Sequence, residues 1–143
     1  MMHKVYLGLG TNLGDKEGNL RKAISLIAER VGTVVRQSSF IETAPWGFES
    51  ENSFVNAAIC VETEKTPREV LLLTQQIERD LGRSKTMLAD SGSPAVPREY
   101  HDRPIDIDIL LYDSITVDEP DLKIPHPLMH ERDFVMIPLK EIY

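Results

Sequence analysis

The sequence predicts a mixed α+β fold in which two helices pack on one antiparallel sheet. Residues 4–9 and 105–112 carry apolar side chains at every second position, the period of a half-buried strand. Two longer segments instead carry apolar residues at helical spacing, and Gly, Pro and Asn clusters separate the segments. With 143 residues, the chain is expected to form a single domain, 1–143.

The first helix is expected soon after the first strand. Asp15 can cap it, Gly32 ends it, and the apolar residues between them fall on one face. These residues are Leu20, Ala23, Ile24, Ile27 and Val31. Residues 33–42 are predicted to form a second strand and residues 53–63 a third, with a turn-forming loop at residues 44–47 between them.

The second helix has a clear start signal. Thr66 can cap it, Pro67 suits the first helical position, and Glu69 can close a capping box. Gly82 is the expected stop, and residues 84–102 are expected to form a long mobile loop before the fourth strand. The tail is expected to contain a Pro-His-Pro turn and one helical turn.

The resulting order is strand, helix, strand, strand, helix, strand. It predicts the ferredoxin-like βαββαβ arrangement, an antiparallel sheet with both helices on one face and the first strand between the third and the fourth. This arrangement serves many activities, so the function has to be argued from a site.

Composition excludes several classes of function. A formal net charge of −7 argues against a nucleic-acid partner or an anionic membrane surface. The sequence contains neither an apolar run long enough to span a membrane nor a secretion signal at its start, so a cytoplasmic protein is expected. Cys60 is the only cysteine and is expected to be a buried, inert thiol.

The fourth strand carries the strongest chemical signal. Asp106 and Asp108 alternate with isoleucines and therefore share the opposite face, with Cα atoms about 6.5 to 7 Å apart. This spacing suits carboxylates that hold one or two Mg²⁺ ions beside nucleotide phosphates. Two solvated aspartates are the alternative, although Asp is disfavoured in strands.

The third strand is expected to complete this face. Its helix-facing residues are Val55, Ala57, Ile59 and Val61, which leaves Phe54 and Asn56 on the opposite, open face. Gly8 and Gly10 of the first strand would lie between them and the aspartates, roughly 10 Å across. We expect the glycines to leave floor space there for a flat ring, although each glycine or aromatic alone is more often a packing residue.

Several cations lie where they can reach phosphates. Arg83 and Arg103 flank the expected loop, which could carry them into the site and exclude water as it closes. Guanidinium groups bind phosphate oxygens through two parallel N–H donors, which suits a site that handles phosphate groups. His126 in the Pro-His-Pro turn is a further candidate, although a lone turn histidine is more often solvated or structural.

These residues match a known family along nearly the whole chain. The matching segments are residues 8–15 (GLGTNLGD), 43–47 (TAPWG), 54–58 (FVNAA), 77–83 (IERDLGR), 103–109 (RPIDIDI), 124–127 (IPHP) and 132–134 (RDF). In this order they make the sequence resemble 6-hydroxymethyl-7,8-dihydropterin pyrophosphokinase of folate biosynthesis. The resemblance implies transfer of pyrophosphate from ATP to the pterin, release of AMP, and two Mg²⁺ ions on Asp106 and Asp108.

The resemblance also implies roles for individual residues. Phe54 and Phe134 would sandwich the pterin, while Asn56 and the backbone near Thr43, Ala44 and Trp46 would bind its hydrogen-bonding edge. The expected triphosphate contacts are Arg83, Lys85, Arg103, His126 and Arg132, and the other expected nucleotide contacts are Gln75, Glu78 and Ile109. Arg83, Arg103, Asp106 and Asp108 are the expected catalytic residues.

Two other functions remain open from the residues alone. A palm-type nucleotidyl transferase or cyclase also places paired carboxylates on such a sheet. A ferredoxin-like domain can also bind a ligand or RNA without catalysis, although the acidic balance counts against RNA. A monomer that acts on small molecules is expected, and an association with another folate enzyme stays open.

Overall fold

The computed structural model describes residues 2–11, 15–43, 54–90, 105–127, 129 and 132–143, and for residues 43, 82–90, 133 and 134 it describes the backbone alone. Its main sheet is antiparallel, with the order β2-β4-β1-β5 and with β3 also paired to β4. The five strands are β1 (His3–Thr11), β2 (Thr33–Gln37), β3 (Ile41–Thr43), β4 (Phe54–Thr63) and β5 (Asp106–Tyr112). The first strand thus lies between β4 and β5, as expected.

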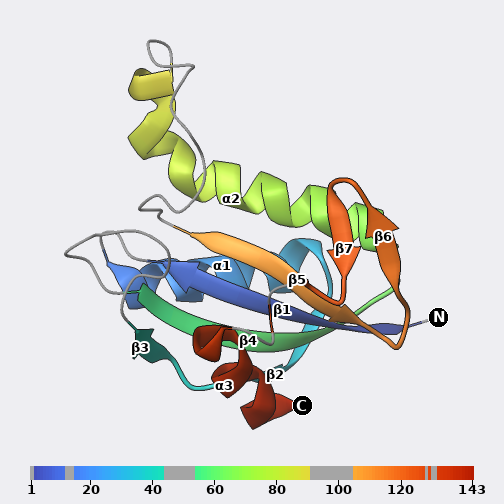
Figure 1. The fold of residues 1–143 in the computed structure, drawn as a ribbon. Helices are drawn as coiled ribbons and strands as arrows, with labels where there is room; N and C mark the ends of the chain where they lie inside the picture. The colour runs from blue at the N-terminus through green and yellow to red at the C-terminus, as the bar shows by residue number, and fades with distance from the viewer. Residues whose placement is uncertain (1, 12–14, 44–53, 91–104, 128, 130–131) are drawn as a thin grey trace.

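Three helices and a hairpin complete the described chain (Figure 1). The helices are α1 (Lys16–Arg30), α2 (Pro67–Asp90) and α3 (Asp133–Ile142), and the hairpin joins β6 (Val117–Glu119) to β7 (Leu122–Ile124). Arg68 on the first turn of α2 forms ion pairs with Glu119 and Asp121 and so holds the hairpin beside that helix. None of the described helices is long and apolar enough to cross a membrane.

The main core lies between the sheet and the pair α1 and α2. It combines alternate residues of β1, β4 and β5 with the apolar faces of the two helices. The strand residues Val5, Leu7, Leu9, Val55, Ala57, Ile59, Val61, Ile105, Ile107 and Ile109 are at most 9% exposed. The expected helix-facing sets of the first and third strands are therefore confirmed, and both helices cover one face.

Both helix starts follow the sequence signals. The Asp15 carboxylate accepts a hydrogen bond from the Gly18 N–H at 3.1 Å and caps α1. At α2 the capping box is closed in both directions, since the Thr66 N–H donates to Glu69 and the Glu69 N–H donates to the Thr66 hydroxyl. These hydrogen bonds hold the pKa of the Glu69 carboxyl below its ordinary value.

The second helix runs past its expected stop. Gly82 lies inside α2, which continues to Asp90, so the prediction that a loop begins at residue 84 is wrong. A glycine inside a helix costs only about 1 kcal/mol relative to alanine, and the segment after it is rich in Arg, Lys, Met, Leu and Ala, which favour helix. Figure 1 shows the last turns of α2 projecting beyond the sheet. The remainder of the expected loop, residues 91–102, lies outside the described residues.

The expected second strand, 33–42, is interrupted. It ends at Gln37, and β3 resumes at Ile41 after three residues that are not in a strand. At the break, Ser38 bonds to β4 through its side chain: the Ala58 N–H donates to the Ser38 hydroxyl at 2.8 Å, and the Ser38 N–H donates to the Ala58 carbonyl at 2.9 Å. The Ala58 N–H thus bonds to the hydroxyl of Ser38 rather than to a backbone carbonyl, and the regular pairing is interrupted between β2 and β3.

The tail is more ordered than expected. In place of one helical turn, α3 spans ten residues and packs on the sheet face opposite α1 and α2 (Figure 1). Its buried residues Val135, Leu139 and Ile142 pack over a patch of the sheet formed by Tyr6, Ala58, Cys60 and Leu110. The expectation that this whole face is open is therefore wrong, because α3 covers part of it. Cys60 is buried, as expected, and burial raises the pKa of its thiol.

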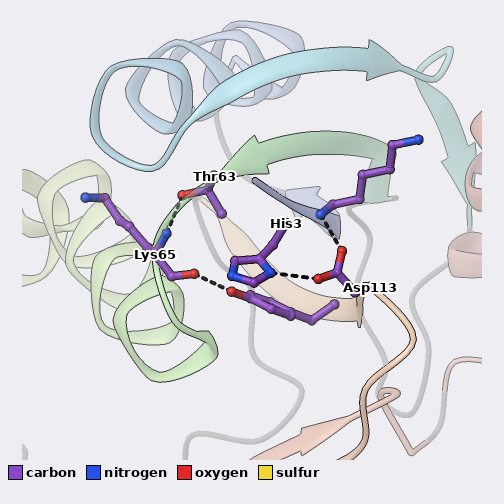
Figure 2. A network of polar contacts seen from close by, with 6 residues as sticks. His3, Thr63, Lys65 and Asp113 are labelled. Atoms are coloured by element: carbon purple, nitrogen blue, oxygen red, sulfur yellow. Dashed lines mark hydrogen bonds and ion pairs between the residues drawn. The ribbon is translucent and has the colours of Figure 1, made fainter. Parts of the chain in front are cut away.

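A polar network ties the far ends of β1 and β5 together (Figure 2). Asp113 accepts a hydrogen bond from the Lys4 N–H and pairs with His3 Nδ1, both at 2.7 Å. The His3 ring lies against the Tyr112 ring, whose hydroxyl donates to the carbonyl of Lys65 at the start of α2. The network therefore joins β1 to the edge strand β5 at the end that lies away from the two aspartates.

Candidate functional site

The register of three strands builds the candidate site. Gly10 on β1 is paired with Asn56 on one side and with Asp106 on the other. Two residues earlier in β1, Gly8 is paired with Ala58 on β4 and with Asp108 on β5. Residues in register across a sheet point to the same face, so Asn56 and Asp106 lie on either side of Gly10, about 10 Å apart.

The two aspartates share the face opposite α1 and α2. Each is partly buried, and they alternate with Ile105, Ile107 and Ile109, which belong to the main core. They are therefore neither splayed to opposite faces nor enclosed in the apolar interior. A partly exposed pair of carboxylates on one face can bind a cation that also contacts a ligand from solvent.

A histidine of the tail approaches this pair, and an arginine lies near that histidine. The Nε2 atom of His126 lies 4.0 Å from the Asp108 carboxylate, and the backbone N–H of His126 donates to the Leu110 carbonyl of β5. Burial lowers the pKa of the His126 imidazole, nearby Arg132 lowers it further, and Asp106 opposes the shift. Arg132 is the residue that precedes α3, so the start of that helix brings a cation close to the histidine.

On the side of Gly10 opposite Asp106, the site contains an amide and an aromatic ring. Asn56 is 3% exposed, and its Oδ1 atom lies 2.7 Å from the point where a Cβ atom on Gly10 would stand. The Phe54 ring lies 3.7 Å from the same point. The space above Gly10 therefore accommodates these two side chains, which a larger residue would displace.

Gly8 does not leave open floor space, contrary to expectation. The Leu110 side chain lies 3.3 Å from where its Cβ atom would stand. The reason is an irregularity in the β1–β5 pairing, where Tyr6 pairs with Leu111 but Leu7 pairs with Ile109. Leu110 is the extra residue, and both it and Leu111 pack with α3 on the site face, so the expected alternation ends at Ile109.

Glu78 on α2 contacts the strand that carries the aspartates. Its carboxylate accepts a hydrogen bond from the Ile107 N–H at 2.7 Å. Ile107 lies between Asp106 and Asp108, so the helix anchors the backbone of this edge strand. Gln75 lies on the same helix and is partly buried, whereas the Ile109 side chain is 5% exposed in the main core. Any contact of Ile109 with a ligand would therefore be made by its backbone.

The remaining expected residues are placed by their backbones or not at all. Thr43 pairs with Phe54 at the end of β3, and Phe134 lies in the first turn of α3. Arg83 and Lys85 lie on α2 beyond Gly82. The other three, Ala44, Trp46 and Arg103, lie outside the described residues.

Leu110 is the site residue that the sequence reasoning missed. It covers Gly8 and packs against Val135 and Leu139 of α3. The available signal was the pair of adjacent leucines at 110 and 111, which breaks the alternation of the strand. Within the ranges that the structure describes, no group of three or more His, Cys, Asp and Glu side chains could hold a metal.

Comparison with known proteins identifies the family. Residues 6–143 match the 7,8-dihydro-6-hydroxymethylpterin-pyrophosphokinase (HPPK) family. The Porphyromonas gingivalis protein named 2-amino-4-hydroxy-6-hydroxymethyldihydropteridine pyrophosphokinase is 47% identical over 139 residues, which cover 96% of this chain and 89% of that one. The Bacillus subtilis protein of the same name is 39% identical over 143 residues, covering 99% of this chain and 79% of its own.

Solved structures agree at the level of the fold. The HPPK-DHPS protein of Plasmodium falciparum, crystallised with pterin and p-hydroxybenzoate, has a TM-score of 0.69 at 16% identity. The match covers 99% of this chain but 38% of that longer one. With a family match over nearly the full length and relatives at 39–47% identity, this chain belongs to the 7,8-dihydro-6-hydroxymethylpterin-pyrophosphokinase family.

Proposed function

We propose that this chain transfers the pyrophosphoryl group of ATP to the hydroxyl of 6-hydroxymethyl-7,8-dihydropterin, yielding AMP and the pterin diphosphate for folate synthesis. The observation that carries the proposal is the row Asn56, Gly10 and Asp106, which sets an amide and a carboxylate pair on one face of the sheet. In the transfer, the hydroxyl oxygen forms a bond to the β-phosphorus of ATP, the bond from that phosphorus to the α,β-bridging oxygen breaks, and AMP leaves.

The carboxylate pair fits magnesium. Mg²⁺ takes oxygen ligands and is usually held by one or two carboxylates together with substrate phosphates and water. Asp106 and Asp108 supply two such carboxylates on a partly exposed face, so we assign two Mg²⁺ ions to them when ATP is present. Bound ions would neutralise phosphate charge, which is much of what phosphoryl transfer needs.

The residues around the aspartates suit a triphosphate. We assign His126 and Arg132 to it, because His126 lies beside a carboxylate that would hold its metal ions and Arg132 lies close to His126. Arg83, Lys85 and Arg103 are assigned to it by the resemblance, as are the nucleotide contacts Gln75, Glu78 and Ile109. We further assign a catalytic role to Arg83 and Arg103, because guanidinium groups stabilise charge that spreads over the transferred group.

The amide end suits a pterin. The Asn56 side chain offers a donor and an acceptor together, which matches the alternating edge of a pterin ring. Phe54 beside it would stack on one face of the ring and Phe134 on the other, each pair adding about 0.5 to 1.5 kcal/mol beyond burial. Backbone groups of residues 43–46 would complete the hydrogen bonds of the edge.

The remaining features of the proposal concern the whole chain. We propose that the core is of the ferredoxin-like type and that residues 1–143 form a single domain. We further propose a cytoplasmic monomer that acts on small molecules rather than on nucleic acid, consistent with the acidic net charge of −7.

A product assay tests the proposed reaction. The purified protein is incubated with ATP, Mg²⁺ and 6-hydroxymethyl-7,8-dihydropterin, and the nucleotide products are separated by ion-exchange chromatography. AMP should accumulate in step with pterin diphosphate, and only when the pterin is present. Release of ADP, of free pyrophosphate, or of no product would reject the proposed transfer, and polymeric or cyclic nucleotides would indicate a palm-type enzyme.

Replacement of the aspartates tests the metal assignment. Asp106→Asn and Asp108→Asn keep the shape of each side chain but remove its charge, and both positions are partly exposed, so the fold should be retained. We expect the turnover number to fall by about three orders of magnitude or more, since the charge that binds the metal would be lost. Near-normal turnover of either variant at saturating Mg²⁺ would contradict the assignment.

A further inference from the structure

The two ends of helix α3 contact different parts of the molecule. Its start, at Arg132, lies near His126. Its last turn lies on the same face of the sheet but over β4, where Ile142 packs on Ala58 and Cys60 and the Tyr143 ring lies 5.3 Å from the ring of Tyr6. A shift of this helix would therefore change the phosphate end of the site.

The last turn of α3 is tied to the break between β2 and β3. Glu141 Oε1 accepts two hydrogen bonds from Ser39, one from its backbone N–H and one from its hydroxyl, both at 2.8 Å. Arg36 at the end of β2 donates to the Ile142 carbonyl at 3.4 Å. We refer to Ser39 and Glu141, with their two hydrogen bonds, as the clamp.

The clamp lies next to β3, the strand that borders the proposed pterin end of the site. Ser39 is two residues before β3, and β3 pairs with the part of β4 that carries the proposed pterin contacts. Thr43 faces Phe54 in this ladder, and Ile41 faces Asn56. Because β3 has only three residues, few ladder hydrogen bonds fix its position. The clamp, two residues before β3, should therefore contribute much to fixing where β3 lies.

We propose that Ser39 and Glu141 are positioning residues that set β3, and with it the pterin contacts, relative to α3. This inference rests on the proposed function and deepens it, because it assigns the specificity of the pterin end to a contact outside the site. The two residues are 102 positions apart in the chain, and both are exposed. Their contact should therefore add little to stability while fixing the geometry of β3.

Steady-state kinetics of five proteins tests the inference. The variants are Glu141→Ala, Glu141→Gln, Ser39→Ala and the double variant Ser39→Ala with Glu141→Ala, and the matched control is Lys140→Ala, an exposed neighbour on the same helix turn. Glu141→Ala should raise KM for the pterin about five- to tenfold, as expected from the loss of a charge-assisted hydrogen bond. KM for ATP and the turnover number should change less than about twofold.

The conservative variant distinguishes positioning from a general structural role. Glutamine retains an oxygen that can accept both bonds from Ser39, so Glu141→Gln should restore KM for the pterin to within about twofold of the wild-type value. The double variant should behave like Glu141→Ala alone, since the two residues act through one contact. Equal increases of KM for both substrates, an unchanged KM for the pterin in Glu141→Ala, or a glutamine variant as impaired as the alanine variant would each overturn the proposal.

Hydrogen exchange gives a readout that does not depend on activity. In Glu141→Ala, amide protons of residues 39–43 should exchange at least about tenfold faster, because the Ser39 N–H loses its acceptor. The Lys140→Ala control should leave these rates unchanged. If the wild-type protein makes no AMP, the proposed reaction is rejected, and hydrogen exchange alone then tests the positioning role of the clamp. Unchanged exchange rates of residues 39–43 in Glu141→Ala would refute that role.

Discussion

At Gly10 the absence of a side chain leaves room for a neighbouring side chain. The Asn56 amide oxygen occupies the position next to it, at 2.7 Å from where a Cβ atom would be. Gly8 differs, because the flexible Leu110 side chain lies above it at 3.3 Å. The two glycines of one strand therefore accommodate different neighbours: Asn56 in the proposed pterin end of the site, and Leu110 in the packing beneath α3.

Alanine substitutions should separate these roles. Gly10→Ala should push the Asn56 amide aside and raise KM for the pterin about tenfold, equivalent to about 1.4 kcal/mol, with KM for ATP changed less than about twofold. Gly8→Ala is the matched comparison and should raise KM for the pterin less, since Leu110 can adjust. Steady-state kinetics with each substrate varied in turn measures both. A larger effect of Gly8→Ala on the pterin would contradict this view.

Some residue positions could be predicted from the sequence and others could not. The shared face of Asp106 and Asp108 was predictable, because alternation along a strand is a local geometric rule. The position of Leu110 was not, since it depends on how β5 pairs with β1. The clamp between Ser39 and Glu141 gave no local signal at all, because neither residue has a pattern that points to the other.

Among the elements, α2 differs most from expectation. The sequence predicts a stop at Gly82 because glycine commonly follows the last turn of a helix. The structure places this glycine inside the helix, with eight further residues after it. Substitution by alanine distinguishes the two cases. A glycine that ends a helix often has a left-handed backbone, where alanine is strained, whereas alanine is more favourable than glycine inside a helix.

Substitution of Gly82 tests the course of this helix. Gly82→Ala should stabilise the protein by about 0.5 to 1 kcal/mol, because alanine favours an interior helical position. Chemical denaturation followed by circular dichroism measures this change. Gly18→Ala is a useful contrast and should destabilise, because the new Cβ atom would lie 2.3 Å from the Asp15 carboxylate that caps α1. Destabilisation by Gly82→Ala would instead indicate a helix that ends there.

The helix α3 shows what local patterns leave out. Its apolar residues Val135, Leu139 and Ile142 have helical spacing, yet Pro138 lies inside the helix and the segment is short. A short segment with a proline is marginal as a helix on its own. Packing on the sheet stabilises it, so its length could be recognised only once the sheet face beneath it was known.

For the molecule as a whole, the ends of β1 and β5 are joined by a hydrogen bond between His3 and Asp113, which lie 110 positions apart in the chain. Burial would raise the pKa of Asp113, but hydrogen bonds from the Lys4 N–H and from His3 outweigh it and hold that pKa below its ordinary value. A carboxyl with a lowered pKa stabilises the folded state above its unfolded pKa of about 3.9. This stabilisation is lost as the pH falls through the lower pKa of the folded state.

The stability of an Asp113→Asn variant should reflect this linkage. At pH 7 its melting temperature should lie below that of the wild type, and the difference should shrink as the pH falls from 5 to below the folded-state pKa. Calorimetry across this range measures it. Asp118→Asn is the control: its carboxylate pairs with Lys123 within one hairpin, so the effect should be smaller. A wild-type advantage that is constant across the range would contradict the prediction.

The sequence by itself determined the order of the four main strands and the two long helices, their apolar faces, the family and the pair of aspartates, because these depend on local periodicity and on short motifs. Only the tertiary structure decided where the strands pair irregularly, how far α2 continues and which half of the site face α3 covers. These features depend on contacts between residues far apart in the chain. Their free energy comes from packing and pairing, which no local pattern records.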